Sequence, residues 1–158
     1  MLIRRLEIFP LIIMIYNNAV ETLPKRFGIK EGVPLEFPVI EFYYKNNDGN
    51  LTWINDYHLY SLRITTPDEI KQISRLASKV NAILRSLCTR RELCITSLQL
   101  EFGKTEGTIY LADELSPKTC HFIDSVGANK ATRERFIPNG KENSDAYAEL
   151  FDRLSLKV

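Results

Sequence analysis

The stretch from Ile95 to Leu115 constrains the fold more than any other part of the chain. Its first half reads ITSLQLEF, in which apolar and polar residues alternate. Alternation with a period of two is typical of a β-strand with one buried face. A second alternating run, TIYLADEL, follows after GKTEG. Because the linker from Gly103 to Gly107 has glycine at both ends, we expect a hairpin with a five-residue loop.

The expected hairpin also predicts where two carboxylates point. With Phe102 paired to Thr108, Glu101 and Asp113 project from one face of the sheet, together with Ser97. Hard cations choose oxygen ligands, and Mg²⁺ usually takes one or two carboxylates plus phosphate oxygens. We therefore place a magnesium ion and a phosphate beside Glu101 and Asp113. The alternative hypothesis is that both are strand acids facing water.

The length and the net charge of the chain limit the classes of protein to which it can belong. A chain of 158 residues with 44% hydrophobic residues is expected to form one domain, residues 1–158. The 21 basic and 20 acidic residues nearly cancel, which argues against a nucleic-acid partner and against a polybasic membrane surface. The apolar run from Leu11 to Ile15 is too short to span a bilayer. Three cysteines without CxxC spacing favour reduced thiols and a cytoplasmic protein.

The first third of the chain predicts two strands and a long connection. Residues Leu6 to Tyr16 are apolar almost throughout after Pro10, which is typical of a central strand covered on both faces. The connection from Asn17 to Pro34 is rich in turn residues and leaves room for one short helical turn within Val20 to Phe27. A second strand is expected from Pro38 to Lys45.

Two helices complete the predicted fold. Thr66, Pro67 and Glu69 form a capping box with proline at the first helical position. The segment Asp124 to Gly140 is irregular, and Arg135 within it is a candidate phosphate ligand or a solvated side chain. We expect an α+β fold, with helices packed on a mostly antiparallel sheet. The apolar positions of the two helices are Ile70, Ile73, Ala77, Val80, Leu84 and Leu87 in the first, and Tyr147, Leu150, Phe151 and Leu154 in the last.

Several linear motifs are more specific than this periodicity. GIKEG, IEFYYK, LEFG, LADE followed by SP, and RERF before a final helix stand in an order and spacing that resemble the SAICAR synthetases, the phosphoribosylaminoimidazole-succinocarboxamide synthases. The resemblance covers nearly the whole chain. It implies the C-terminal ATP and substrate lobe of that fold, without the N-terminal β-rich lobe whose lysines cover the ATP phosphates in the family.

The resemblance implies an ATP-dependent ligase of purine biosynthesis. Such an enzyme joins L-aspartate to the carboxylate of carboxyaminoimidazole ribonucleotide through an acyl phosphate, because a free carboxylate resists attack by an amine. Phosphoryl transfer of this kind depends mainly on positioning and charge neutralisation. Family members use the acids found here as Glu101 and Asp113 for the nucleotide and Mg²⁺. The substrate-binding positions correspond to Thr22, Ser116, His121 and Arg135.

Some charged positions differ from the family pattern. Tyr16 stands where the family has arginine, and Glu21 stands where it has glycine, so a guanidinium is lost and a carboxylate is added. In the hairpin, D-x-K-x-E becomes Ser97, Gln99 and Glu101, which removes a lysine. We expect the fold to survive these changes and ligase activity to be very low or absent. The alternatives are a non-catalytic remnant that binds nucleotide weakly, or a module that self-associates or pairs with a separately encoded N-terminal lobe.

Overall fold

A computed structural model describes residues 5–112, 114–126, 136 and 144–155. Within these residues the strands form two antiparallel sheets, a five-stranded sheet of order β4-β3-β2-β5-β8 and a three-stranded sheet of order β1-β6-β7. The elements are β1 (Glu7–Ile8), β2 (Leu11–Asn18), α1 (Leu23–Phe27), β3 (Pro34–Lys45), β4 (Leu51–Ile54), α2 (Asp56–Ser61), α3 (Pro67–Thr89), β5 (Leu93–Leu100), β6 (Phe102–Thr105), β7 (Thr108–Leu111), β8 (Cys120–Asp124) and α5 (Ser144–Leu154).

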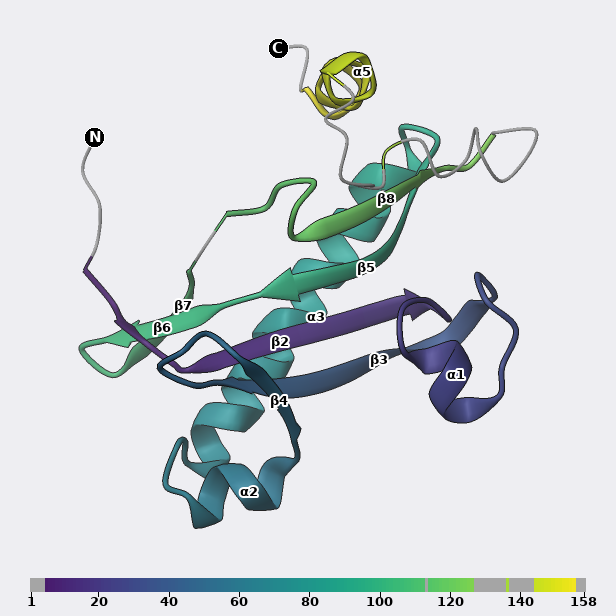
Figure 1. The fold of residues 1–158 in the computed structure, drawn as a ribbon. Coiled ribbons are helices and arrows are strands. Elements are labelled where there is room, and N and C mark those ends of the chain that lie inside the picture. The colour runs from purple at the N-terminus through teal and green to yellow at the C-terminus, as the bar shows by residue number, and fades with distance from the viewer. Residues whose placement is uncertain (1–4, 113, 127–135, 137–143, 156–158) are drawn as a thin grey trace.

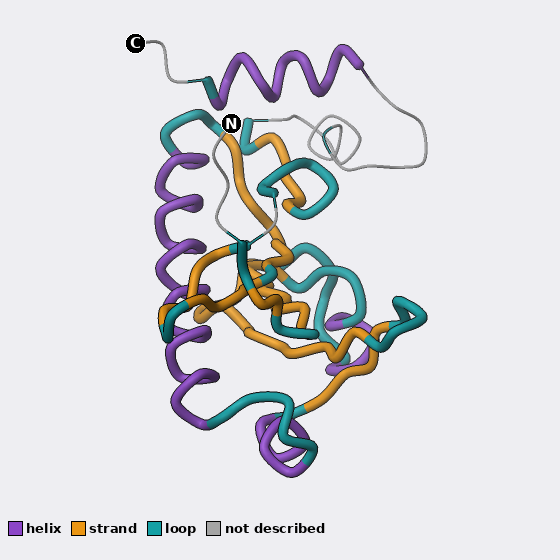
Figure 2. Tube along the Cα trace, turned by 90° about the vertical axis from the view of Figure 1, so that its left-hand side faces the viewer, coloured by secondary structure: helices purple, strands orange, loops and turns teal. Residues whose placement is uncertain are grey.

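The long helix α3 covers one face of the five-stranded sheet. Figure 1 shows it running behind the strands, and the view turned by 90° in Figure 2 places it on one side of the sheet. The short helix α1 lies on the other side (Figures 1 and 2). The predicted α+β architecture, with helices packed on an antiparallel sheet, is therefore confirmed.

Strand β2 is central and buried, as its apolar sequence predicts. It pairs with β3 on one side and with β5 on the other. The predicted single strand from Leu6 to Tyr16 is wrong in one respect. The strand is interrupted at Phe9–Pro10, and the part before it, β1, pairs with β6 in the other sheet. Proline has no backbone N–H to donate to a ladder, which explains why neither strand continues through Pro10.

The predicted hairpin loop is also wrong. Phe102 pairs with Leu111 rather than with Thr108, and Thr105 pairs with Thr108 across a two-residue turn. The two turn residues, Glu106 and Gly107, have φ angles of 51° and 75°. Two consecutive positive φ values define a type I′ turn, whose twist matches that of the flanking strands. The hairpin is therefore β6 and β7, whereas β5 pairs with β2 and β8.

Gly103 serves packing rather than the turn. It lies within β6, opposite Ile8 of β1. A Cβ atom at this position would come within 2.8 Å of the Leu6 Cβ atom and 3.1 Å of the Glu7 carbonyl oxygen. Only glycine allows the two strands to approach this closely without a shift of the backbone.

Helix α3 begins as predicted. The Thr66 hydroxyl accepts a hydrogen bond from the Glu69 backbone N–H, and the Glu69 carboxylate accepts one from the Thr66 backbone N–H. Between the helix and the sheet, Asn17 and Asn81 exchange two amide hydrogen bonds of 2.9 Å, and Asn17 also donates to the Ile95 carbonyl. Both amides are buried, so this contact ties α3 to β2 and β5.

Three short elements are absent from the sequence prediction. β4 extends the sheet beyond the predicted turn of residues 46–50. α2 begins at Asp56, and its N-cap Asn55 forms a capping box with His58. β8 pairs with β5 at the far edge, in a segment that the sequence left unassigned. The second strand, β3, begins at Pro34, four residues before its predicted start.

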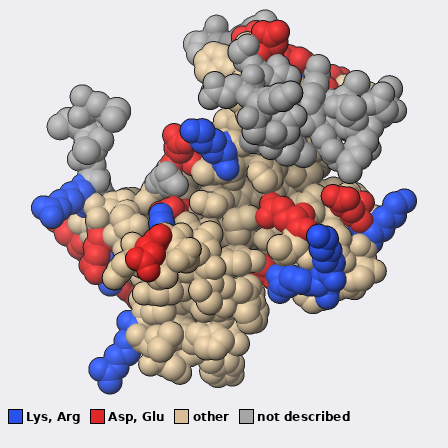
Figure 3. Space-filling model, viewed as in Figure 1, with Lys and Arg blue, Asp and Glu red and all other residues tan. Residues whose placement is uncertain are grey.

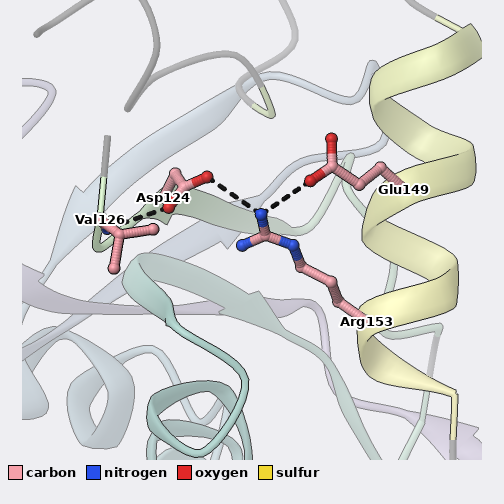
Figure 4. Close-up of polar contacts among 4 residues, drawn as sticks. All are labelled: Asp124, Val126, Glu149 and Arg153. Carbon is pink, nitrogen blue, oxygen red and sulfur yellow. Dashed lines mark hydrogen bonds and ion pairs between the residues drawn. The ribbon is translucent and has the colours of Figure 1, made fainter. Parts of the chain in front are cut away.

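Arg153 of helix α5 contacts the end of β8 (Figure 4). Arg153 donates to the Asp124 carboxylate at 3.3 Å and to Glu149, one turn earlier in α5, at 2.7 Å. The other oxygen of Asp124 accepts from the Val126 backbone N–H. The predicted last helix is confirmed, but Phe151 of its expected apolar face is 72% exposed, whereas Leu150 is 2% exposed and packs in the core.

The cysteines Cys88, Cys94 and Cys120 are free thiols. Burial raises the pKa of Cys88 to about 11 and also raises the pKa of Cys120, so both stay protonated at neutral pH. In the part of the chain that the structure describes, no helix combines the length and the apolar character needed to cross a membrane.

Candidate functional site

The face of the sheet opposite α3 carries most of the polar side chains of the central strands, and Ile12 and Met14 of β2 lie among them. Strand alternation sends Ile13, Ile15 and Leu98 into the core under α3, so their neighbours face the other way. Tyr16 of β2 pairs in register with Ser97 of β5, and Ser97 pairs with His121 of β8. We call this surface the polar face; its members are Tyr16, Glu41, Tyr43, Lys45, Ser97, Gln99 and His121, with Glu21 and Arg26 reaching it from the β2–β3 connection.

Glu21 is the centre of one cluster on the polar face. Its carboxylate oxygen accepts a hydrogen bond of 2.7 Å from the Ser97 hydroxyl and lies 3.4 Å from Nδ1 of His121. Ser97 Oγ and His121 Nδ1 are 3.1 Å apart. Burial raises the pKa of Glu21, but hydrogen bonds from His121, Ser97 and Tyr16 outweigh it and leave the pKa below its ordinary value. Glu21 is therefore an anion at neutral pH.

Glu41 is the centre of a second cluster. Its carboxylate forms an ion pair of 2.8 Å with Arg26 of α1 and accepts a hydrogen bond of 2.9 Å from the Tyr43 hydroxyl. Burial and the negative charge of Glu21 raise the pKa of Tyr16, which also bonds to Tyr43. Burial also raises the pKa of Tyr43, so both phenols are neutral at neutral pH.

A third pair lies where the polar face meets the second sheet. Lys45, the last residue of β3, has its ammonium 3.5 Å from the Glu101 carboxylate. The Glu101 side chain is 17% exposed, whereas that of Lys45 is 47% exposed. The Glu101 carbonyl accepts from the Ala112 backbone N–H at 2.9 Å, which brings the chain before residue 113 next to Glu101. Figure 3 shows charged side chains gathered at opposite ends of this face, with uncharged surface between them.

The structure brings together some of the predicted site residues and separates others. His121 lies against Ser97 and against Glu21, which is the residue before Thr22. Thr22 is exposed at the start of α1, where its side chain forms no capping hydrogen bond. Ser116 lies in a loop turn, where its hydroxyl donates to Glu114. Two further candidates, Asp113 and Arg135, lie outside the described residues.

Sequence reasoning missed Arg26, Glu41, Tyr43 and Lys45 as site residues. The signal was present in IEFYYK, because the last three of these residues alternate along one strand with apolar neighbours. The contact with Arg26 was not visible, since it depends on how α1 returns over the sheet.

The donor groups near Glu101 fit only part of what a magnesium ion requires. Among them no group of three or more His, Cys, Asp or Glu side chains gathers as a metal site. Glu101 alone provides a carboxylate at the expected position, beside the ammonium of Lys45. One carboxylate is enough for Mg²⁺ when nucleotide phosphates supply further oxygens, so the donor set fits a magnesium nucleotide rather than a free ion.

Comparisons with known proteins place this chain and its fold in one family. Residues 1–153 match the model of the SAICAR synthetase family. The chain belongs to the SAICAR synthetase family. The phosphoribosylaminoimidazole-succinocarboxamide synthase of Caldanaerobacter subterraneus subsp. tengcongensis is 39% identical over 154 residues, which are 98% of this chain and 66% of that protein. The synthase of Thermoanaerobacter sp. (strain X514) is 38% identical over the same shares.

Solved SAICAR synthetases have the same fold. A SAICAR synthetase (Type-2) in complex with ADP is 36% identical and superposes with a TM-score of 0.85 over 96% of this chain and 65% of its own. The Type-1 structure from Pyrococcus horikoshii OT3 is 35% identical, with a TM-score of 0.84 over 95% of this chain and 66% of its own. This chain thus spans about two thirds of the length of the SAICAR synthetases that it matches.

Proposed function

We propose that the polar face binds a magnesium nucleotide and belongs to an ATP-dependent ligase of purine biosynthesis. The reaction is the joining of L-aspartate to the carboxylate of carboxyaminoimidazole ribonucleotide through an acyl phosphate. The observation that carries the proposal is the 36% identity and TM-score of 0.85 to a family structure that contains ADP. The residues at the end of the face, Lys45 and Glu101, have the charges that such a ligand requires.

Lys45 and Glu101 have complementary roles in this proposal. The half-exposed ammonium of Lys45 would contact a phosphate oxygen, and the more buried carboxylate of Glu101 would hold Mg²⁺ or a ribose hydroxyl. Asp113 is the proposed second carboxylate. When bound, Mg²⁺ would neutralise charge on the phosphates. The protein groups would hold the nucleotide in place, which is the larger part of catalysis in phosphoryl transfer.

We further propose that ligase turnover by this chain is very low. Tyr16 is 1% exposed and neutral, so it does not supply the charge of a guanidinium. Glu21 places a carboxylate on the face where an anionic substrate would bind. Loss of one preorganised donor typically costs about 3 to 4 kcal/mol of transition-state stabilisation. A nucleotide-binding protein without ligase activity is the second candidate, and the Glu21 carboxylate is the observation that favours it.

Binding of ADP with Mg²⁺ to the purified chain, measured by isothermal titration calorimetry, tests the nucleotide site. We expect saturable binding that Glu101→Gln weakens at least tenfold. Glu36→Gln, which changes an exposed glutamate of β3, is the matched control and should bind like the wild type. Absence of both heat and NMR chemical-shift change at millimolar ADP would contradict the proposal. Efficient product formation from ATP, aspartate and the ribonucleotide would contradict the proposed low turnover.

Exposed apolar side chains indicate that this chain contacts another protein chain. Apolar side chains at the α1 and β3–β4 edge are exposed, among them Phe27 at 61%, Phe37 at 75% and Trp53 at 48%. Exposed apolar surface of this kind is typical of protein contacts. We propose that residues 1–158 form one domain that either self-associates or pairs with a separately encoded β-rich lobe. Light scattering that gives a monomer at all concentrations would exclude self-association.

A further inference from the structure

Helix α3 carries positive charge without matching negative charge. From Ile70 to Arg91 the sequence has six basic residues and no acidic one, whereas the whole chain has a formal net charge of only +1. The rest of the chain is therefore net acidic. Of the two acids in the first turn of α3, Glu69 is paired with Lys104 and Asp68 lies where the helix dipole favours a carboxylate. We call the exposed basic residues of α3 the basic stripe; they are Lys71, Arg75, Lys79, Arg85 and Arg90.

The basic stripe lies on the side of α3 that is turned away from the sheet. With 3.6 residues per turn, its five members fall within about 140° of the helix circumference. Ile73, Ala77 and Asn81 are buried, and they lie on the opposite side of the helix. Figure 2 shows α3 along one edge of the molecule, with the sheet on its inner side. From Lys71 to Arg90 the stripe extends for about 29 Å along the helix axis.

Contacts within the described residues do not neutralise the basic stripe. Among these residues, no ion pair involves any of its five members. Lys71, Arg75 and Lys79 follow one another at intervals of four residues, and like charges at this spacing destabilise a helix. Folding therefore does not account for the stripe, whereas an anionic partner would remove the repulsion.

The surroundings of the basic stripe favour a protein partner over a nucleic acid or a membrane. The Ile83 side chain is 58% exposed and lies between Lys79 and Arg85. An apolar side chain among charged ones is typical of a contact with another polypeptide. DNA and anionic bilayers are extended negative surfaces, which the net acidic remainder of the chain would repel. A single acidic segment, by contrast, contacts α3 alone.

We propose that the basic stripe docks an acidic helical segment of a partner protein. Carboxylates on successive turns of that segment pair with the stripe, and one apolar side chain packs on Ile83. Packed helices lie about 8 to 10 Å apart, a distance that lysine and arginine side chains can bridge to a carboxylate. The stripe faces away from the sheet, whereas Lys45 and Glu101 belong to the sheet, so the inference does not depend on nucleotide binding.

The probe for this surface is a fluorescently labelled synthetic peptide of about 20 residues, which matches the length of the stripe at 1.5 Å per residue. It has glutamate at every fourth position and one central leucine in an alanine-rich helix. A second peptide has the same composition in a scrambled order, so its net charge is equal but its glutamates point in all directions. Fluorescence anisotropy with the full chain, at low and at physiological salt, measures both affinities.

The stripe variant combines Lys71→Gln, Arg75→Gln and Lys79→Gln. Glutamine has a helix propensity close to that of lysine and arginine, so α3 should be kept. We expect the affinity for the ordered peptide to fall at least tenfold. The urea midpoint of unfolding should stay at the wild-type value or rise, because repulsion between neighbouring turns is removed. A merely structural role of these residues would lower the midpoint instead.

The matched control combines Lys25→Gln, Lys30→Gln and Lys118→Gln, which removes the same number of charges at exposed positions outside α3. It should bind the ordered peptide like the wild type, because the contact depends on the stripe rather than on net charge. Ile83→Ala should weaken binding by about threefold to tenfold through lost apolar contact.

The wild type should bind the ordered peptide at least tenfold more tightly than the scrambled one. Equal affinity for the two peptides, or for the wild type and the stripe variant, would overturn the proposal. Tighter binding of a DNA duplex or of phosphatidylserine vesicles than of the ordered peptide would also overturn it, as would self-association that the stripe variant alone abolishes. ADP affinity of the stripe variant should stay at the wild-type value, which separates this test from that of the nucleotide site.

Discussion

The two faces of the five-stranded sheet are built from the same strands but hold different kinds of interaction. Under α3, alternate residues of β2, β3 and β5 form an apolar core that includes fully buried Ile13, Ile15 and Ile73. On the polar face, the neighbouring residues of the same strands form ion pairs and hydrogen bonds around Glu21 and Glu41.

This difference separates the requirements of folding from those of chemistry. Burial of apolar side chains dominates stability, whereas polar contacts that are partly open to water contribute little net free energy. The fold is therefore kept at 36 to 39% identity to relatives of the family. Substitutions that compare the two faces test this separation.

The largest expected effect is on the α3 side. Ile73 is 0% exposed, so Ile73→Ala should lower the free energy of unfolding by about 2 to 5 kcal/mol through lost burial and the cavity left behind. Ile83 of the same helix is 58% exposed, and Ile83→Ala should change it by less than about 0.5 kcal/mol. Urea unfolding followed by circular dichroism measures both. Equal costs for the two variants would show that α3 does not pack as described.

A smaller effect is expected at the buried amide pair. Asn81→Ala removes one partner of Asn17 and should cost about 1 to 3 kcal/mol, because a buried amide then lacks a hydrogen-bond partner. The double variant Asn17→Ala with Asn81→Ala should cost less than the sum of the two single variants, as residues in direct contact are not additive. Strict additivity in the same urea experiment would mean that the pair does not couple.

How much of this was visible in the sequence differs between the two faces. The core side follows from local patterns: the apolar run of β2 and the capping box at Thr66 predict a central strand and a helix that begins at Pro67. Gly103 was misleading, because a glycine that permits close strand packing cannot be told from a turn glycine by its position alone. The true turn used Glu106 with Gly107.

The polar face was harder to predict because its contacts join distant parts of the chain. Glu21 and Ser97 are 76 positions apart, and their contact depends on the register of β2 with β5. Alternation predicted that Ser97 and Glu101 face away from the core, but it gave no sign that Lys45 pairs with Glu101 or that Glu21 bonds to His121. The family resemblance supplied candidate residues, and the strand register supplied their neighbours.

The smallest expected effect is the pH dependence of stability due to Glu21. Its pKa is lower in the folded chain than in the unfolded chain, where a glutamate has a pKa of about 4.3. The ionised carboxylate therefore stabilises the fold above that pH, and the contribution is lost as the pH falls through the lower folded value. Because the side chain is 30% exposed, we expect less than about 1 kcal/mol.

Thermal unfolding of the wild type and of Glu21→Gln between pH 3 and pH 7 measures this contribution. The glutamine variant should lose less stability on acidification, while Glu36→Gln, at an exposed position of β3, should follow the wild type. The groups that lower the pKa of Glu21 lie on strands of the polar face. If Glu21→Gln alone loses less stability between pH 7 and pH 3, this pH dependence therefore comes from the polar face. Parallel curves for all three proteins would mean that Glu21 is solvated rather than held by Ser97 and His121, and the two faces would then differ less than their contacts indicate.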